Sequence, residues 1–83
     1  MNVNDDHIFD VRLELDTFRL AAEKDPTRTI AELSRHKAEE FADEHRLRLR
    51  HPDPREVELS EAINPTTGKP VTLVATRWIA DSR

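Results

Sequence analysis

A chain of 83 residues can form one small domain with a modest core, but it is too short to enclose a deep active site. It contains no cysteine, which excludes disulfides, thiolate nucleophiles and cysteine-ligated zinc. The formal charge of −4 argues against non-specific binding to nucleic acid or to acidic membranes. We therefore expect one small acidic domain spanning residues 1–83.

Residues 1–7 are polar and predict a flexible lead-in to this domain. They lack the basic and apolar regions of a secretory signal, and no apolar run in the chain approaches the roughly 18 residues that span a bilayer. These features predict a cytoplasmic protein without a membrane segment. Ten of the thirteen basic residues are arginine, a bias that suits the GC-rich genome of a bacterium or phage.

The segment 8–16 alternates strictly between apolar and charged residues, the pattern of a half-buried strand. Its apolar positions are Phe9, Val11, Leu13 and Leu15. The alternative is a helix, which would give an N-terminal helical hairpin followed by a β-hairpin. We favour the strand because a helix would leave Phe9, Leu13 and Leu20 on the wrong side of its apolar stripe.

The segment 17–24 is helix-prone and ends before Asp25-Pro26, after which a longer helix is expected. Thr29 and Glu32 have the spacing of a capping box, which predicts the start of this helix, and its end is expected near His45 or Arg46. Its expected apolar arc contains Ile30, Leu33, Ala38, Phe41, Ala42 and His45. His45 is expected to be partly buried with one hydrogen bond near the helix end.

Three strands are expected in the C-terminal half. Residues 46–50 and 55–62 both alternate, and the sequence HPDP between them predicts a turn that pairs the two segments. The sequence NPTTGKP predicts a hairpin turn leading into a last strand over 71–79. The predicted fold is α+β, β-α-β-β, with a small antiparallel sheet of three or four strands and one main helix packed on one face.

The alternating arginines of 46–50 suggest either a structural role within the sheet or a role in nucleic-acid binding. If this strand pairs with 55–62, the arginines lie beside Glu56 and Glu58, which would neutralise them. The alternative is a nucleic-acid-binding protein that uses Arg46, Arg48, Arg50, His51 and Arg55.

No motif for catalysis, cofactor binding or metal binding is present. His36 and Glu40 share one helix face, but zinc needs three or four convergent ligands. The Gly68-Lys69 pair lacks the rest of a phosphate-binding loop, and Pro70 occupies its Ser/Thr position. We expect a protein that is not an enzyme and that needs no cofactor or metal.

The last strand has apolar residues on both faces, so one face of the sheet is expected to keep Val74 and Trp78 partly exposed beside Arg77. The alternative is a tryptophan in the core beneath the helix. From the exposed arrangement we predict a small acidic, non-catalytic protein-binding or regulatory module that self-associates through a sheet face or edge. Its size and acidity also suit a phage-type inhibitor of a host protein.

Overall fold

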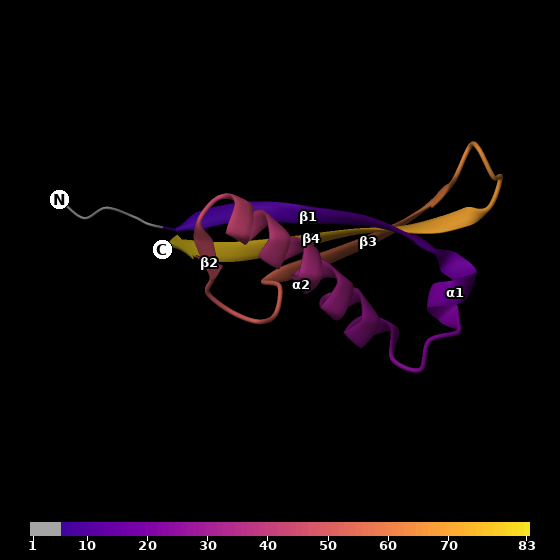
Figure 1. Cartoon of the computed structure of the whole chain (residues 1–83). Helices are drawn as coiled ribbons and strands as arrows, with labels where there is room; N and C mark the ends of the chain where they lie inside the picture. Colours follow the sequence, from indigo (N-terminus) through magenta and orange to yellow (C-terminus); the bar gives the residue numbers. More distant parts are fainter. Residues whose placement is uncertain (1–5) are drawn as a thin grey trace.

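The computed structural model describes residues 6–83, which form an antiparallel four-stranded sheet with one main helix (Figure 1). The elements are β1 (His7–Asp16), α1 (Thr17–Ala21), α2 (Pro26–Glu44), β2 (Leu47–Leu49), β3 (Glu56–Ile63) and β4 (Pro70–Ser82). The predicted α+β class is confirmed, and the helical alternative for 8–16 is wrong. A flexible lead-in was expected for residues 1–7, but residues 1–5 lie outside the described part of the chain. His7 already belongs to β1, and its Nε2 lies 3.1 Å from Ser82 Oγ.

β4 is the centre of the sheet, because it is paired along both of its edges. β1 pairs with it from His7 opposite Ala80 to Asp16 opposite Val71. On the other edge β3 pairs with residues 70–77 and β2 with residues 80–82, so these two strands follow each other along the same edge.

The predicted pairing of 46–50 with 55–62 is therefore wrong. Pro52 and Pro54 have no N–H to give to a ladder, so the chain between them leaves the sheet instead of turning back on itself. The chain is hydrogen-bonded to β4 on both sides of this loop. Before it, Arg50 N–H donates to Ile79 O at 2.9 Å, and after it, Arg55 N–H donates to Arg77 O at 2.7 Å.

The predicted hairpin between β3 and β4 is confirmed. The Asn64 side chain accepts hydrogen bonds from the backbone N–H groups of Thr66 and Thr67, at 2.8 and 3.2 Å. Gly68 has a φ of 70°, a conformation that costs a glycine little. This turn lies at the end of the sheet opposite to β2 and the C-terminus (Figure 1).

α2 begins four residues earlier than the capping box predicts, because its N-cap is Asp25 instead of Thr29. Asp25 is its N-cap and accepts from Arg28 N–H at 3.2 Å, while Pro26 occupies the first turn, where its missing N–H is not needed. The predicted end is confirmed, because the helix stops at Glu44 with His45 as its C-cap. α1 is shorter than the helix-prone segment and is capped by Asp16.

Small residues let α2 lie close to the sheet. Its buried positions are Ile30, Ser34, Ala38 and Ala42, spaced four apart along one face. Ala38 packs with Val11 and Trp78, and a second cluster joins Ala42 to β2 and the end of β4. Of the predicted arc, Leu33 is 44% exposed, so the helix contacts the sheet along a narrower stripe than the sequence suggests.

The C-terminal end of α2 is held by stacked rings. The Phe9 and Phe41 ring centroids lie 4.3 Å apart, and those of Phe41 and His45 lie 4.1 Å apart. His45 Nδ1 lies 2.9 Å from Phe41 O, which is the single hydrogen bond predicted for it. The predicted partial burial of His45 is wrong, since its side chain is exposed.

The buried indole of Trp78 provides a test of this core. Its Nε1–H donates to Thr76 Oγ1 at 2.8 Å, and both residues are 1% exposed. Thr76→Val removes the acceptor and should lower the free energy of unfolding by about 1–3 kcal/mol, because the N–H then has no partner. In a Trp78→Phe background the same change should be nearly neutral. Urea unfolding of the four proteins measures this coupling, and equal losses in both backgrounds would contradict it.

Candidate protein-binding edge

α2 is too short to cover the sheet. A strand of 13 residues such as β4 spans about 43 Å, whereas the 19-residue α2 spans about 28 Å. The main contacts of α2 are with β1, β2 and β4. β3, which lies beside the turn end of β4, is therefore left outside the layer that the helix covers.

As a result, β3 exposes an apolar stripe on the helix side of the sheet. Val57, Leu59 and Ile63 lie opposite Thr76, Val74 and Pro70. Directly opposite residues of an antiparallel pair project to the same face, so the three side chains lie on the face that α2 covers elsewhere. They are 50%, 57% and 62% exposed, whereas Val74 beside them is 2% exposed.

The same residues present the free backbone groups of β3. In an antiparallel ladder, hydrogen-bonded and non-hydrogen-bonded pairs alternate. Asn64 N–H donates to Lys69 O across the hairpin, and Pro70, opposite Ile63, has no N–H to donate. The even-numbered residues of β3 are therefore bonded to β4. The free edge carries the N–H and C=O groups of Val57, Leu59, Glu61 and Ile63.

The free edge of β1 is different. The same alternation directs the backbone groups of its even-numbered residues away from β4, and these include Asp10, Arg12 and Glu14. Charged residues at such positions discourage pairing with another chain. β3 has no lysine or proline, and its register from Glu56 to Ile63 contains no bulge. Of the four free-edge residues of β3 only Glu61 is charged, so this edge is less protected against pairing than the edge of β1.

An arginine on the opposite face joins the three long strands. Arg77 Nε donates to Asp10 Oδ1 at 3.1 Å, and its Nη1 lies 3.6 Å from Glu56 Oε2. The hydrogen bond from Arg77 lowers the pKa of Asp10, and the same bond raises the pKa of Arg77. Arg77 thus fixes β3 beside β4 and β1 on the face away from the apolar stripe.

The predicted binding surface of Trp78, Val74 and Arg77 is not brought together. Trp78 and Val74 are 1% and 2% exposed, because they lie on the helix side of the sheet, so their predicted exposure is wrong. The core alternative for Trp78 is confirmed. Arg77 is accessible, but it projects from the opposite face and is engaged by Asp10 and Glu56.

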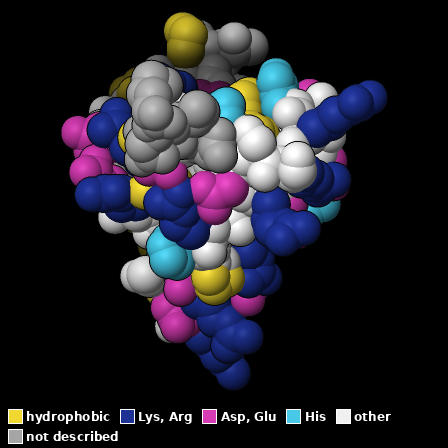
Figure 2. Space-filling view, turned by 90° about the vertical axis from the view of Figure 1, so that its left-hand side faces the viewer, with side chains coloured by type: hydrophobic (Ala, Val, Ile, Leu, Met, Phe, Trp, Pro, Cys, Tyr) yellow, Lys and Arg dark blue, Asp and Glu magenta, His cyan; other side chains and the backbone are white. Residues whose placement is uncertain are grey.

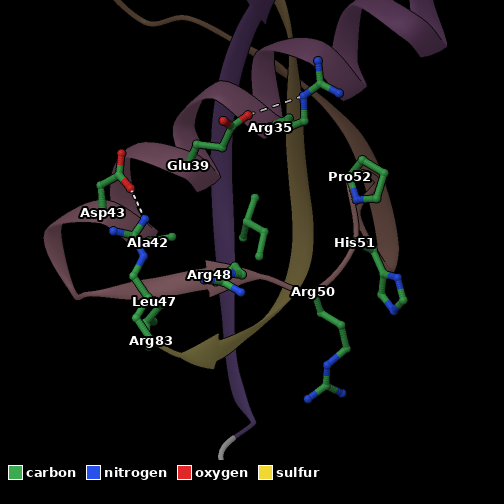
Figure 3. A pocket seen from close by; sticks show the side chains of 11 residues that line it. Arg35, Glu39, Ala42, Asp43, Leu47, Arg48, Arg50, His51, Pro52 and Arg83 are labelled. Carbon is green, nitrogen blue, oxygen red and sulfur yellow. Dashed lines mark hydrogen bonds and ion pairs between the residues drawn. The ribbon is translucent and has the colours of Figure 1, made fainter.

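The arginine-rich segment contributes to an open hollow of about 460 Å³ between α2 and β2 (Figure 3). Arg48 and His51 line it, but two other lining arginines are paired, Arg35 with Glu39 and Arg83 with Asp43. Arg50 extends away from α2 in this view. The positive charge of the hollow is therefore largely balanced.

Arg50 is held by two carboxylates, Asp6 and Asp81, instead of by the predicted glutamates of β3. The hydrogen bond from Arg50 lowers the pKa of Asp81. Arg46, Arg48 and Arg55 form no ion pair within residues 6–83, but Figure 2 shows acidic side chains interspersed among the basic ones at this end of the molecule. Of the five predicted nucleic-acid-binding residues, Arg48, Arg50 and His51 line the same hollow, and Arg50 is engaged there by Asp6 and Asp81.

Neither the described residues nor comparisons with known proteins point to a further site. Within residues 6–83, no three His, Asp or Glu side chains are grouped closely enough to hold a metal ion, and no helix of this part is long and apolar enough to cross a membrane. No protein-family model, curated protein sequence or solved structure matches the chain.

Proline substitutions test which backbone groups of β3 face the free edge. Glu61→Pro removes an N–H that has no partner in the ladder, whereas Ser60→Pro removes one that bonds to β4. Both side chains are exposed, so the two variants are a matched pair. Ser60→Pro should lower the free energy of unfolding by at least about 2 kcal/mol more than Glu61→Pro. A larger loss for Glu61→Pro than for Ser60→Pro in urea unfolding would show that the odd-numbered residues of β3, and not the even-numbered ones, are bonded to β4.

The arginine bridges predict how stability depends on pH. Asp10 and Asp81 have a lower pKa in the folded chain than their ordinary value of 3.8. Their contribution to stability is therefore complete above about pH 5 and is lost as the pH falls through 3.8 toward their folded pKa. In urea unfolding between pH 2 and 7, Asp10→Asn should reduce this dependence, whereas Asp53→Asn in the proline loop should not. Equal curves for Asp10→Asn and the unchanged protein would contradict the bridge.

Proposed function

We propose that this protein is a small, non-catalytic protein-binding module that takes up an extended segment as an added strand along β3. The observation that carries this proposal is the coincidence on β3 of free backbone groups and exposed apolar side chains. The main-chain groups of Val57, Leu59, Glu61 and Ile63 would supply affinity, and their alternating side chains would supply selectivity. Such a module could act as a regulator, because a partner segment that is paired with β3 is no longer free to bind another protein.

The other classes of function have less support. The hollow between α2 and β2 is open and its lining arginines Arg35 and Arg83 are paired, so it offers no enclosed set of converging polar groups for catalysis. Surfaces that bind single-stranded nucleic acid usually combine unpaired basic residues with exposed aromatic rings. The exposed aromatic side chain of Phe18 belongs to α1, far along the chain from Arg46 and Arg48.

Selection from a displayed library of random extended peptides tests the proposal. The unchanged protein should enrich peptides in which apolar residues alternate with polar ones, because they can pair with the stripe on β3. Glu61→Pro should enrich none of them, because it blocks the free edge without removing a ladder bond. Arg48→Gln, in the hollow, is the control and should select as the unchanged protein does. Identical selections by the unchanged protein and Glu61→Pro would overturn the proposed site.

A further inference from the structure

We infer that β3 pairs with β3 of a second copy of this chain, in an antiparallel register with Ser60 opposite Ser60 on a two-fold axis. This inference rests on the proposed function, since it names the occupant of the same edge. The two sheets would join into one, with both α2 helices on the same face. Four features of β3 lead to this arrangement.

The first feature is the symmetry of the pair. Two identical antiparallel strands related by a two-fold axis place one residue opposite its own copy at the centre. Centring on Glu58 or Glu61 would put two carboxylates directly opposite each other, which is destabilising. Centring nearer either end of β3 would leave most of the strand unpaired. Leu59 and Ser60 are therefore the two possible centres.

The second feature is the use of the free backbone groups. With Ser60 at the centre, Val57 lies opposite Ile63 and Leu59 opposite Glu61, so all four outward-facing residues of each copy find a hydrogen-bonding partner. With Leu59 at the centre, Ile63 falls opposite Arg55, which precedes β3 and whose N–H already donates to Arg77 O. The Ser60 register therefore satisfies more of the edge.

The third feature is the match between side chains. The Ser60 register pairs Val57 with Ile63 twice, so residues that are 50% and 62% exposed in one copy cover each other. The Leu59 register instead has one apolar pair, Leu59 with its own copy, and places Val57 opposite Glu61. Apolar cross-strand pairs contribute to the stability of a sheet, and they favour the Ser60 register.

The fourth feature is the distribution of charge. No two glutamates are directly opposite in the Ser60 register, because Glu58 faces Ala62 and Glu61 faces Leu59. Glu61 and its copy are diagonal neighbours, about 7–8 Å apart. This repulsion is weak at an exposed site, and the register therefore tolerates the acidity of β3.

Single cysteines test the register, because the chain has none of its own. Ser60 and its copy form a non-hydrogen-bonded pair with Cα atoms about 4.5 Å apart, within disulfide range. Under mild oxidation of the full chain, Ser60→Cys should form a covalent dimer at least tenfold faster than Glu58→Cys. Glu58→Cys is the matched control, since its Cα atoms would be about 14 Å apart.

Other outcomes would overturn the inference. Equal rates for Ser60→Cys and Glu58→Cys would exclude the central position of Ser60, and fastest cross-linking of Leu59→Cys would show the other register. Light scattering gives a second readout: the unchanged chain should approach twice its 9.6 kDa mass at millimolar concentration. A mass of 9.6 kDa throughout would exclude the second copy as occupant. The peptide selection would still decide the proposed function independently.

Discussion

The mismatch in length between β4 and α2 determines the organisation of this protein. β4 organises the sheet because every other strand pairs with it, but the one long helix covers only part of the sheet that β4 spans. Where α2 is present, Val11, Trp78 and Ala80 are buried. Beside the turn end of β4, the same face of the sheet meets solvent through β3. An uncovered strand with an open edge is therefore a direct consequence of how the elements differ in length.

Arginine side chains form ion pairs between elements that the hydrophobic core does not hold together. Arg50 joins Asp6, just before β1, to the end of β4. Arg77 joins β1 to β3, and Arg83 joins the C-terminus to α2. These bridges occupy guanidinium groups that could otherwise bind phosphate. Three of the ten arginines of the chain are thus used to connect elements of the fold.

Local patterns in the sequence were sufficient to predict most of the individual strands and helices. Three local patterns depend only on neighbouring residues: the two-residue alternation of 8–16, the helical spacing after Asp25 and the turn sequence NPTTGKP. They predicted β1, α2 and the β3–β4 hairpin. The start of α2 was missed because Asp25-Pro26 is also a start signal, and it precedes the capping box.

The candidate site depends on non-local pairing, which these patterns do not contain. The alternation of 55–63 identified a strand, but only the pairing with β4 shows that Val57 and Leu59 lie beyond the reach of the helix. The sequence left Trp78 between a partly exposed position and the core, because both faces of β4 carry apolar residues. Ser34 was left out of the core because it is polar, although the helix approaches the sheet closely at this position.

Amide hydrogen exchange along β3 tests most directly that its outer edge is open and binds another strand. At micromolar concentration the amides of Val57, Leu59, Glu61 and Ile63 should exchange rapidly, while those of the even-numbered residues are protected by β4. At millimolar concentration the four should become protected as a second strand pairs with them. Protection of these four amides at every dilution, or rapid exchange at every concentration, would contradict the account.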